Sequence, residues 1–220
     1  MGRYGILTQA HNTIMLDGQQ QVGVQGIARA PIPAGSWTSE AGYDTAFSST
    51  EFEDLGDATI HTRGVYHDRE TGLIAVVDRV TTPLPRQLEA FWHAHPDSNV
   101  TMAADGSSAF VRAGNGATLV VARDDSGLEF NSTCLRGQVT PSIQGWYSRI
   151  YSEKAPSPVA VFETRVPAGV TTLAWVLRPA QAHQSVQMTR PMIASANATG
   201  AWIVVEFAAG HGTRVFVPLA

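Results

Sequence analysis

The sequence is poor in cysteine, in charge and in long apolar runs, and each shortage excludes a class of protein. Cys134 is the single cysteine among 220 residues, so no internal disulfide can form. Lys and Arg number 15 against 19 Asp and Glu, without a basic cluster, which argues against nucleic-acid binding. No apolar run approaches the roughly 20 residues that span a bilayer, so we expect no membrane span.

Familiar catalytic signatures and helical patterning are also missing. The chain contains no Gly-x-Ser-x-Gly elbow, no Walker loop and no dinucleotide-binding fingerprint. The chain also lacks the helical patterning of Ala, Glu, Lys and Leu residues that favours α-helices. These absences leave a turn-rich β protein as the class to consider.

Turn residues are plentiful, with 20 Gly and 12 Pro, and they separate short β-prone runs at roughly 8 to 14 residue intervals. The predicted strands are 20–30, 58–66, 73–81, 86–95, 108–113, 117–123, 128–135, 158–165, 170–177, 184–190, 201–208 and 213–218. Strands that bury one face each need a second sheet to cover that face. The sequence therefore predicts an all-β protein, a large two-layer antiparallel β-sandwich, with residues 1–220 in a single domain.

The segment 31–57 is predicted to be an exposed excursion between strands. It mixes polar residues with four aromatic ones, Trp37, Tyr43, Phe47 and Phe52. Aromatic rings in such a loop either anchor it to the core or line a groove for sugars. Both interpretations stay open at this point.

The stretch Tyr4 to Gln21 carries the first chemical signal. His11 and Asn12 open a β-prone run that stops at Asp17-Gly18, a dipeptide suited to a tight turn. A strand end of this kind holds an imidazole in a fixed direction, as a metal ligand or general base requires. His11 is therefore a candidate metal ligand or general base.

Three segments, in this order, resemble the C-terminal β-sheet domain of the heparinase II/III family of polysaccharide lyases. They are His11-Asn-Thr followed by Asp17-Gly-Gln, Leu73 to Val80 leading to Trp92-His-Ala-His95-Pro, and Gly145-Trp-Tyr-Ser148. The resemblance implies a β-sandwich that packs on an upstream α/α toroid, in a longer lyase that acts on acidic polysaccharide by β-elimination. It also implies a periplasmic or secreted location.

The resemblance further implies a structural zinc ion held by His11 together with a His and an Asp from the preceding part of such a lyase. The catalytic groups of the family lie mainly on the toroid, so no catalytic residue is assigned here. The tyrosines of the chain, Tyr4, Tyr43, Tyr66, Tyr147 and Tyr151, stay without a catalytic role. If the toroid normally covers the first residues, apolar side chains there are partly exposed and the chain self-associates. Those side chains are Tyr4, Ile6, Leu7, Ile14, Met15 and Leu16.

Two other functions compete with this one. A non-catalytic carbohydrate-binding β-sandwich is compatible with the predicted fold. A cupin-like metalloenzyme would use His93 and His95, which alternation places on one face of a strand. The cupin pattern also asks for Gly at position 87 and Glu at position 99 or 100, where the chain has Gln87, Asn99 and Val100. The remaining histidines are predicted to be surface or packing residues.

Overall fold

The structure is a computed structural model, and it describes residues 4–21, 33–150, 153–184, 190–207 and 212–220. Helical structure in these ranges is limited to three short 3₁₀ turns, η1 (Tyr4–Ile6), η2 (Thr8–Ala10) and η3 (Glu53–Leu55). The all-β prediction is confirmed. No helix in the described ranges has the length and apolar character needed to cross a membrane.

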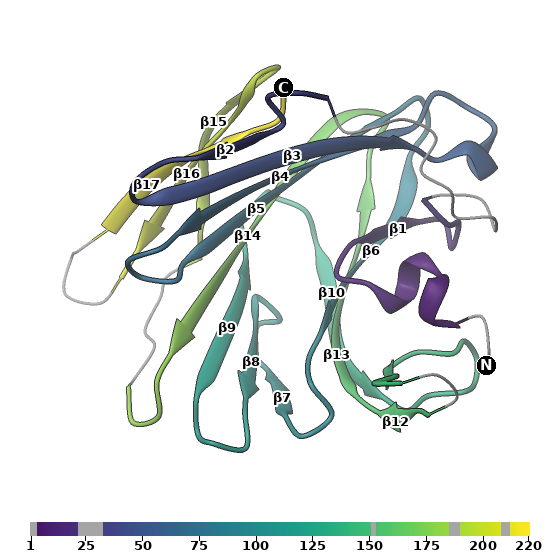
Figure 1. Cartoon of the computed structure of the whole chain (residues 1–220). Coiled ribbons are helices and arrows are strands. Elements are labelled where there is room, and N and C mark those ends of the chain that lie inside the picture. Colours follow the sequence, from purple (N-terminus) through teal and green to yellow (C-terminus); the bar gives the residue numbers. More distant parts are fainter. Residues whose placement is uncertain (1–3, 22–32, 151–152, 185–189, 208–211) are drawn as a thin grey trace.

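The larger layer is an eight-stranded antiparallel sheet in the order β2-β3-β4-β5-β14-β9-β8-β7 (Figure 1). Its strands are β2 (Trp37–Ser39), β3 (Tyr43–Glu51), β4 (Ile60–Asp68), β5 (Ile74–Thr82), β14 (Gly169–Ala180), β9 (Thr118–Arg123), β8 (Ser108–Arg112) and β7 (Asn99–Met102). The facing layer is a four-stranded antiparallel sheet in the order β1-β6-β13-β10. It contains β1 (Ile14–Leu16), β6 (Arg86–His93), β13 (Pro158–Val166) and β10 (Phe130–Arg136). A short ribbon pairs β11 (Trp146–Tyr147) with β12 (Ala155–Pro156).

The core between the two layers is centred on Trp175 of β14, which is fully buried. Its ring lies 5.2 Å from the ring of Phe162 on β13 and 5.7 Å from that of Trp92 on β6. Edge-on and tilted contacts of this kind add to the burial of apolar area. The predicted two-layer sandwich is thus closed by aromatic side chains from both sheets.

A third, three-stranded sheet covers the other face of the eight-stranded sheet. It consists of β15 (Met192–Asn197), β16 (Gly200–Glu206) and β17 (Gly212–Pro218), in that order. Ile203 and Val217 of this sheet pack with Ala75 and Val77 of β5 and with Ala174 of β14. Both faces of β5 and β14 are therefore covered, which accounts for their nearly continuous apolar sequences.

The N-terminal segment is better buried than the sequence predicted. Ile14 and Leu16 are fully buried against the core, and Met15 and Tyr4 are 8% and 7% exposed. The reason is that β1 pairs with β6, and that Met15 packs with Phe91 on the outer face of the four-stranded sheet, away from the core between the two layers. Ile6 alone of the predicted set is largely exposed, at 68%. The prediction that exposed apolar side chains cause self-association is therefore wrong for Tyr4, Ile14, Met15 and Leu16.

The prediction of an excursion between strands at 31–57 is wrong for residues 37–39 and 43–51, although many of their side chains are exposed as predicted. Residues 37–39 and 43–51 form β2 and β3, which extend the eight-stranded sheet beyond β4. Polar and apolar residues alternate weakly in β3, because neither face of this edge region is fully buried. Phe52 does act as a buried anchor, whereas Trp37 is 68% exposed.

Most of the other predicted strands match β4 to β6, β8 to β10, β13, β14, β16 and β17 to within a few residues. The strands β7 and β15 were not predicted. The predictions for 20–30 and 184–190 fall almost entirely outside the described residues.

Candidate functional site

Three segments that are far apart in the sequence meet at one end of the four-stranded sheet. The side-chain oxygen of Asn12 accepts a hydrogen bond from the backbone N–H of His93, at 2.7 Å. The Oε1 atom of Gln144 lies 3.2 Å from Nε2 of His93 and also accepts a hydrogen bond from the hydroxyl group of Tyr4. Gln144 in turn donates to the backbone carbonyl of Gln9, at 2.9 Å. We call Tyr4, Asn12, His93 and Gln144 the junction cluster.

His93 is held in a fixed orientation within the junction cluster. Burial lowers its pKa, partly offset by the hydrogen bond with Gln144, and the nearby His11 lowers it further. Both ring nitrogens face amide oxygens, Nε2 that of Gln144 and Nδ1 that of Asn12 at 3.3 Å, and these two contacts fix the orientation of the ring. Burial also raises the pKa of Tyr4, so its phenol stays protonated.

A buried ionic network supports the junction cluster from the eight-stranded sheet. Asp78 of β5 is fully buried and accepts hydrogen bonds from Arg63 at 2.7 and 2.9 Å and from Trp175 at 2.9 Å. His61 lies 2.7 Å from the same carboxylate. Burial opposes the charged form of Asp78, but the charge of Arg63 and the bond with His61 hold its pKa well below the usual range. Arg63 also donates to the backbone carbonyl of Asn12, which ties the network to the cluster.

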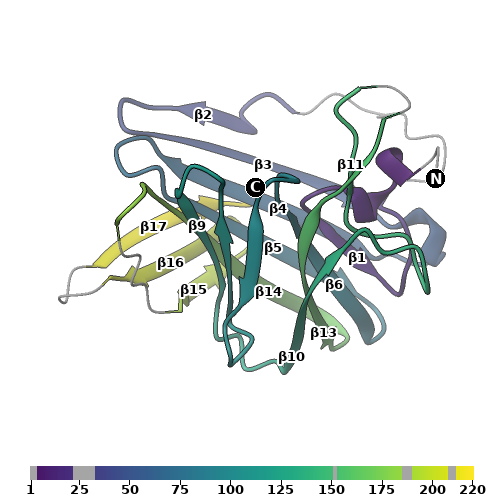
Figure 2. The ribbon, with the colours of Figure 1, turned by 90° about the horizontal axis from the view of Figure 1, so that it is seen from below.

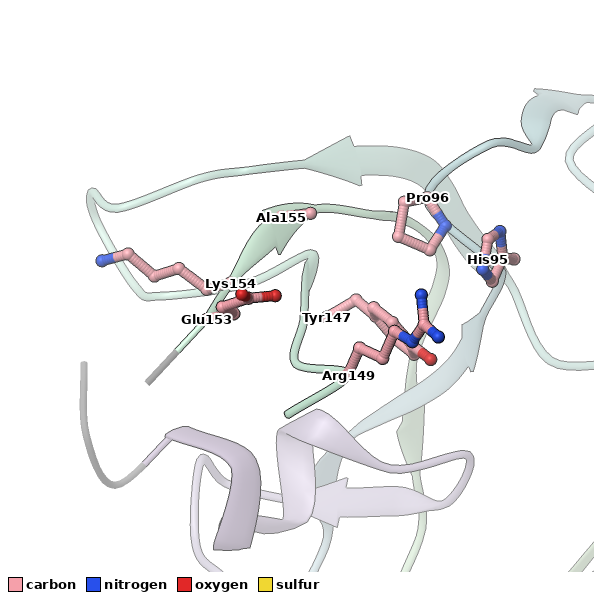
Figure 3. Close-up of a pocket in the computed structure, with 7 residues that line it drawn as sticks. All are labelled: His95, Pro96, Tyr147, Arg149, Glu153, Lys154 and Ala155. Atoms are coloured by element: carbon pink, nitrogen blue, oxygen red, sulfur yellow. The ribbon is translucent and has the colours of Figure 1, made fainter. Parts of the chain in front are cut away.

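An open pocket of about 570 Å³ lies next to the junction cluster (Figure 3). One wall is the turn after β6, with His95 and Pro96, and the other is formed by Tyr147, Arg149 and residues 153–155. Figure 3 shows Tyr147, Arg149, Glu153 and Lys154 on that second wall. The ring of His95 is 5.5 Å from that of Tyr147. His95 therefore turns to the pocket, while His93 belongs to the junction cluster.

The described residues do not assemble a metal centre. His11 follows η2, is exposed, and lies near His93. No group of three or more His, Cys, Asp or Glu side chains in the described ranges is placed to hold a metal ion. A zinc site takes three or four such ligands. The donor set in the described residues does not fit a complete zinc site, and His93 and His95 do not lie in a group of ligands of the kind that the cupin-like alternative requires.

Comparison with known protein families shows to which family the chain belongs. The chain matches the family model "Heparinase II/III-like, C-terminal" over residues 3–176. The chain belongs to this family. The matched residues include His11, the His93 segment and Gly145 to Ser148, the three motifs on which the resemblance rested. Comparison with the curated proteins gives no match.

Solved structures of heparinase II/III-type lyases share the fold. The heparan sulfate lyase HepC from Pedobacter heparinus superposes with a TM-score of 0.77 at 18% identity, over 97% of this chain and 31% of that one. A heparinase III described as the BT4657 gene product gives 0.71 at 14% identity, over 97% of this chain and 30% of the other. A further heparinase III gives 0.69 at 13%, with 97% and 30% covered. The chain thus spans about a third of the length of the solved lyases it matches.

Sequence reasoning missed Asn12, Gln144 and Tyr4 as partners of His93. Asn12 was visible as part of a motif, but amides and phenols have no spacing rule that pairs residues 51 to 89 positions apart. Asp78 and His61 were likewise not paired, although the polar Asp78 inside the apolar run 73–80 was a usable signal.

Proposed function

We propose that this chain is the β-sandwich domain of a polysaccharide lyase that cleaves uronic-acid-containing chains by β-elimination. In this role it packs on a helical toroid domain, closes one side of the substrate cleft, and works in the periplasm or outside the cell. Family membership supports the assignment, and the titles of the similar structures name heparan sulfate lyase and heparinase III. The chain's own activity and substrate belong to the proposal.

The observation that carries the proposal is the junction cluster. Asn12 and His93 lie in two of the segments that resemble the family, Gln144 directly precedes the third, and hydrogen bonds join the three residues at one end of the sheet. Their convergence next to an open pocket supports the assignment of this end to the face toward the cleft.

The chemistry divides between the domains in this proposal. β-Elimination requires a base that removes the C5 proton, a group that stabilises the developing negative charge, and a proton for the leaving oxygen. The helical domain supplies the main catalytic groups. This chain contributes an oriented imidazole at His93, whose pKa burial lowers, and polar hydrogen-bonding groups at the cleft wall.

We also propose that His11 is one ligand of a structural zinc ion whose other ligands lie on the helical domain. Its exposure and its place beside the junction cluster support this role. No catalytic step depends on that ion.

The test is the ultraviolet absorbance of the unsaturated uronyl product. We expect residues 1–220 alone to give no product from heparan sulfate, alginate or hyaluronan, and the chain linked to its helical domain to give product from one of them. Activity of the isolated chain would overturn the division of labour. An inactive but folded linked protein that still binds these polymers would instead favour a carbohydrate-binding sandwich.

A further inference from the structure

The pocket between the β6 end and the β11–β12 segment has a charge unlike that of the whole molecule. The chain carries a net charge of −4. The pocket is lined by two permanent cations, Arg149 and Lys154, and one carboxylate, Glu153. A lining with more cations than carboxylates attracts anions.

Arg149 is the cation best placed for a ligand. Its side chain is exposed, and within the described residues it makes no ion pair with a carboxylate. Figure 3 shows its guanidinium beside the ring of Tyr147 and directed toward His95. A planar guanidinium offers paired N–H donors that match the oxygens of a carboxylate or a sulfate.

The pocket also offers a flat apolar surface. Tyr147 is 38% exposed, and its backbone is fixed by pairing of β11 with Ala155 of β12. The ammonium of Lys154 lies 5.4 Å from the ring of Trp146, which keeps the Lys154 side chain along the same ribbon. An aromatic ring beside cations suits a pyranose that bears an acidic group, since the ring stacks on the sugar while the cations bind the charge.

We propose that this pocket is a subsite for one acidic sugar unit of a polysaccharide. Arg149 binds its carboxylate or sulfate, Tyr147 packs against the sugar ring, and Glu153 accepts hydrogen bonds from hydroxyl groups. The volume of about 570 Å³ lies within the usual range for small-ligand sites. The proposal rests on the proposed lyase function and adds the residues that select an anionic substrate.

Calorimetric titration of the 220-residue chain tests the subsite with three tetrasaccharides: a sulfated heparin fragment, an unsulfated uronate fragment and a neutral glucan fragment. We expect an acidic fragment to bind and the neutral one not to bind. Binding of only the sulfated fragment identifies sulfate as the bound group, whereas equal binding of both acidic fragments identifies the carboxylate. Failure of both acidic fragments to bind would overturn the proposal.

The key variant is Arg149→Gln, with Arg165→Gln as its matched control. Arg165 is also exposed, but pairs with Gln87 at the opposite end of β13 from the pocket. We expect R149Q to weaken binding about tenfold or more, as loss of a charged hydrogen bond does, with an unchanged melting temperature. Arg165→Gln should have little effect. Equal losses in both variants would show nonspecific attraction and contradict the subsite.

The same variants separate this proposal from the lyase function. If the linked protein forms unsaturated product and R149Q leaves its KM unchanged, the subsite is wrong while the lyase function stands. If acidic fragments bind through Arg149 but no product forms, the subsite stands and the lyase function fails.

Discussion

At the scale of single residues, Asp78 links the eight-stranded sheet to the junction cluster. Its carboxylate is fully buried and binds Arg63, His61 and Trp175. Loss of one partner from a buried charge network is strongly destabilising, because the remaining charges stay buried without compensation. Asp78 therefore holds Arg63, and through it the Asn12 segment, in place.

We predict that Asp78→Asn lowers the free energy of unfolding by about 3 kcal/mol or more. The measurement is urea unfolding at neutral pH. Asp54→Asn is the control, because Asp54 is exposed in the first turn of η3 and should change stability by less than about 0.5 kcal/mol. Similar midpoints for the two variants would show that the network contributes little.

Asp124 gives the fold a pH dependence of its own. It is 2% exposed at the end of β9, and its Oδ1 atom accepts the Ala174 N–H at 2.8 Å. Burial raises its pKa from 3.8 to about 7, against the opposing effect of the hydrogen bond from Ala174. Between about pH 4 and 7 the folded state therefore keeps a proton that the unfolded state releases, so stability falls as pH rises through this window.

We predict that Asp124→Asn removes this pH-dependent part of the stability, while the amide oxygen of the new side chain still accepts the hydrogen bond from the Ala174 N–H. The unfolding free energy of the parent chain minus that of Asp124→Asn should decrease from pH 5 to pH 8, by at most about 1.4 kcal/mol per pH unit. Urea titrations at four pH values check it. A difference that stays constant with pH would mean that Asp124 is ionised throughout.

His11 leads to a prediction about metal removal. Because the described residues supply too few ligands for zinc, we expect the isolated chain to bind zinc no more tightly than its His11→Ala variant. Its melting temperature should not change with a chelator. Stoichiometric zinc that disappears in His11→Ala would show that the isolated chain already completes the site.

At the scale of elements, strand alternation and turn residues predicted most of the fold correctly. Two sequences carry clear strand signals. The apolar run at 73–77 belongs to a strand that is buried on both faces, and the alternation at 86–93 belongs to a strand that is buried mainly on one face. β3 was missed because its sequence, Tyr-Asp-Thr-Ala-Phe-Ser-Ser-Thr-Glu, lies in a part of the sheet with no fully buried position. Pairing with β4 selects this strand, and single-sequence periodicity does not record pairing.

Contact between β4 and the third sheet depends on Gly64. A Cβ atom at this position would meet the backbone carbonyl of Pro218 and would lie 2.8 Å from Cγ1 of Val217, both on β17. Backbone atoms cannot move aside as a flexible side chain does. The absence of a side chain at Gly64 therefore lets β17 pack closely on the eight-stranded sheet.

We predict that Gly64→Ala costs about 1 to 3 kcal/mol, the usual range for overpacking. Gly42→Ala is the control, because an added Cβ there has nothing within 4 Å. Thermal unfolding compares the two. Equal melting temperatures would contradict the close approach of β17.

At the scale of the whole molecule, the fold places the candidate site and the third sheet on different sides. Figures 1 and 2 place the N-terminal turns and β11 on one side of the molecule and the three-stranded sheet on the other. The junction cluster and the pocket lie on the first side. The sequence could predict the sandwich and the family, but not this separation, since all three strands of the third sheet lie beyond the residues matched by the family model.

The central claim is that the end carrying Asn12, His93 and Tyr147 faces acidic polysaccharide. Hydrogen–deuterium exchange of the chain linked to its helical domain, with and without acidic oligosaccharides, measures this directly. We predict slower exchange in 8–13 and 144–150 when the oligosaccharide is present, and no change in 200–206 or 212–218. Protection confined to β16 and β17 would contradict the account.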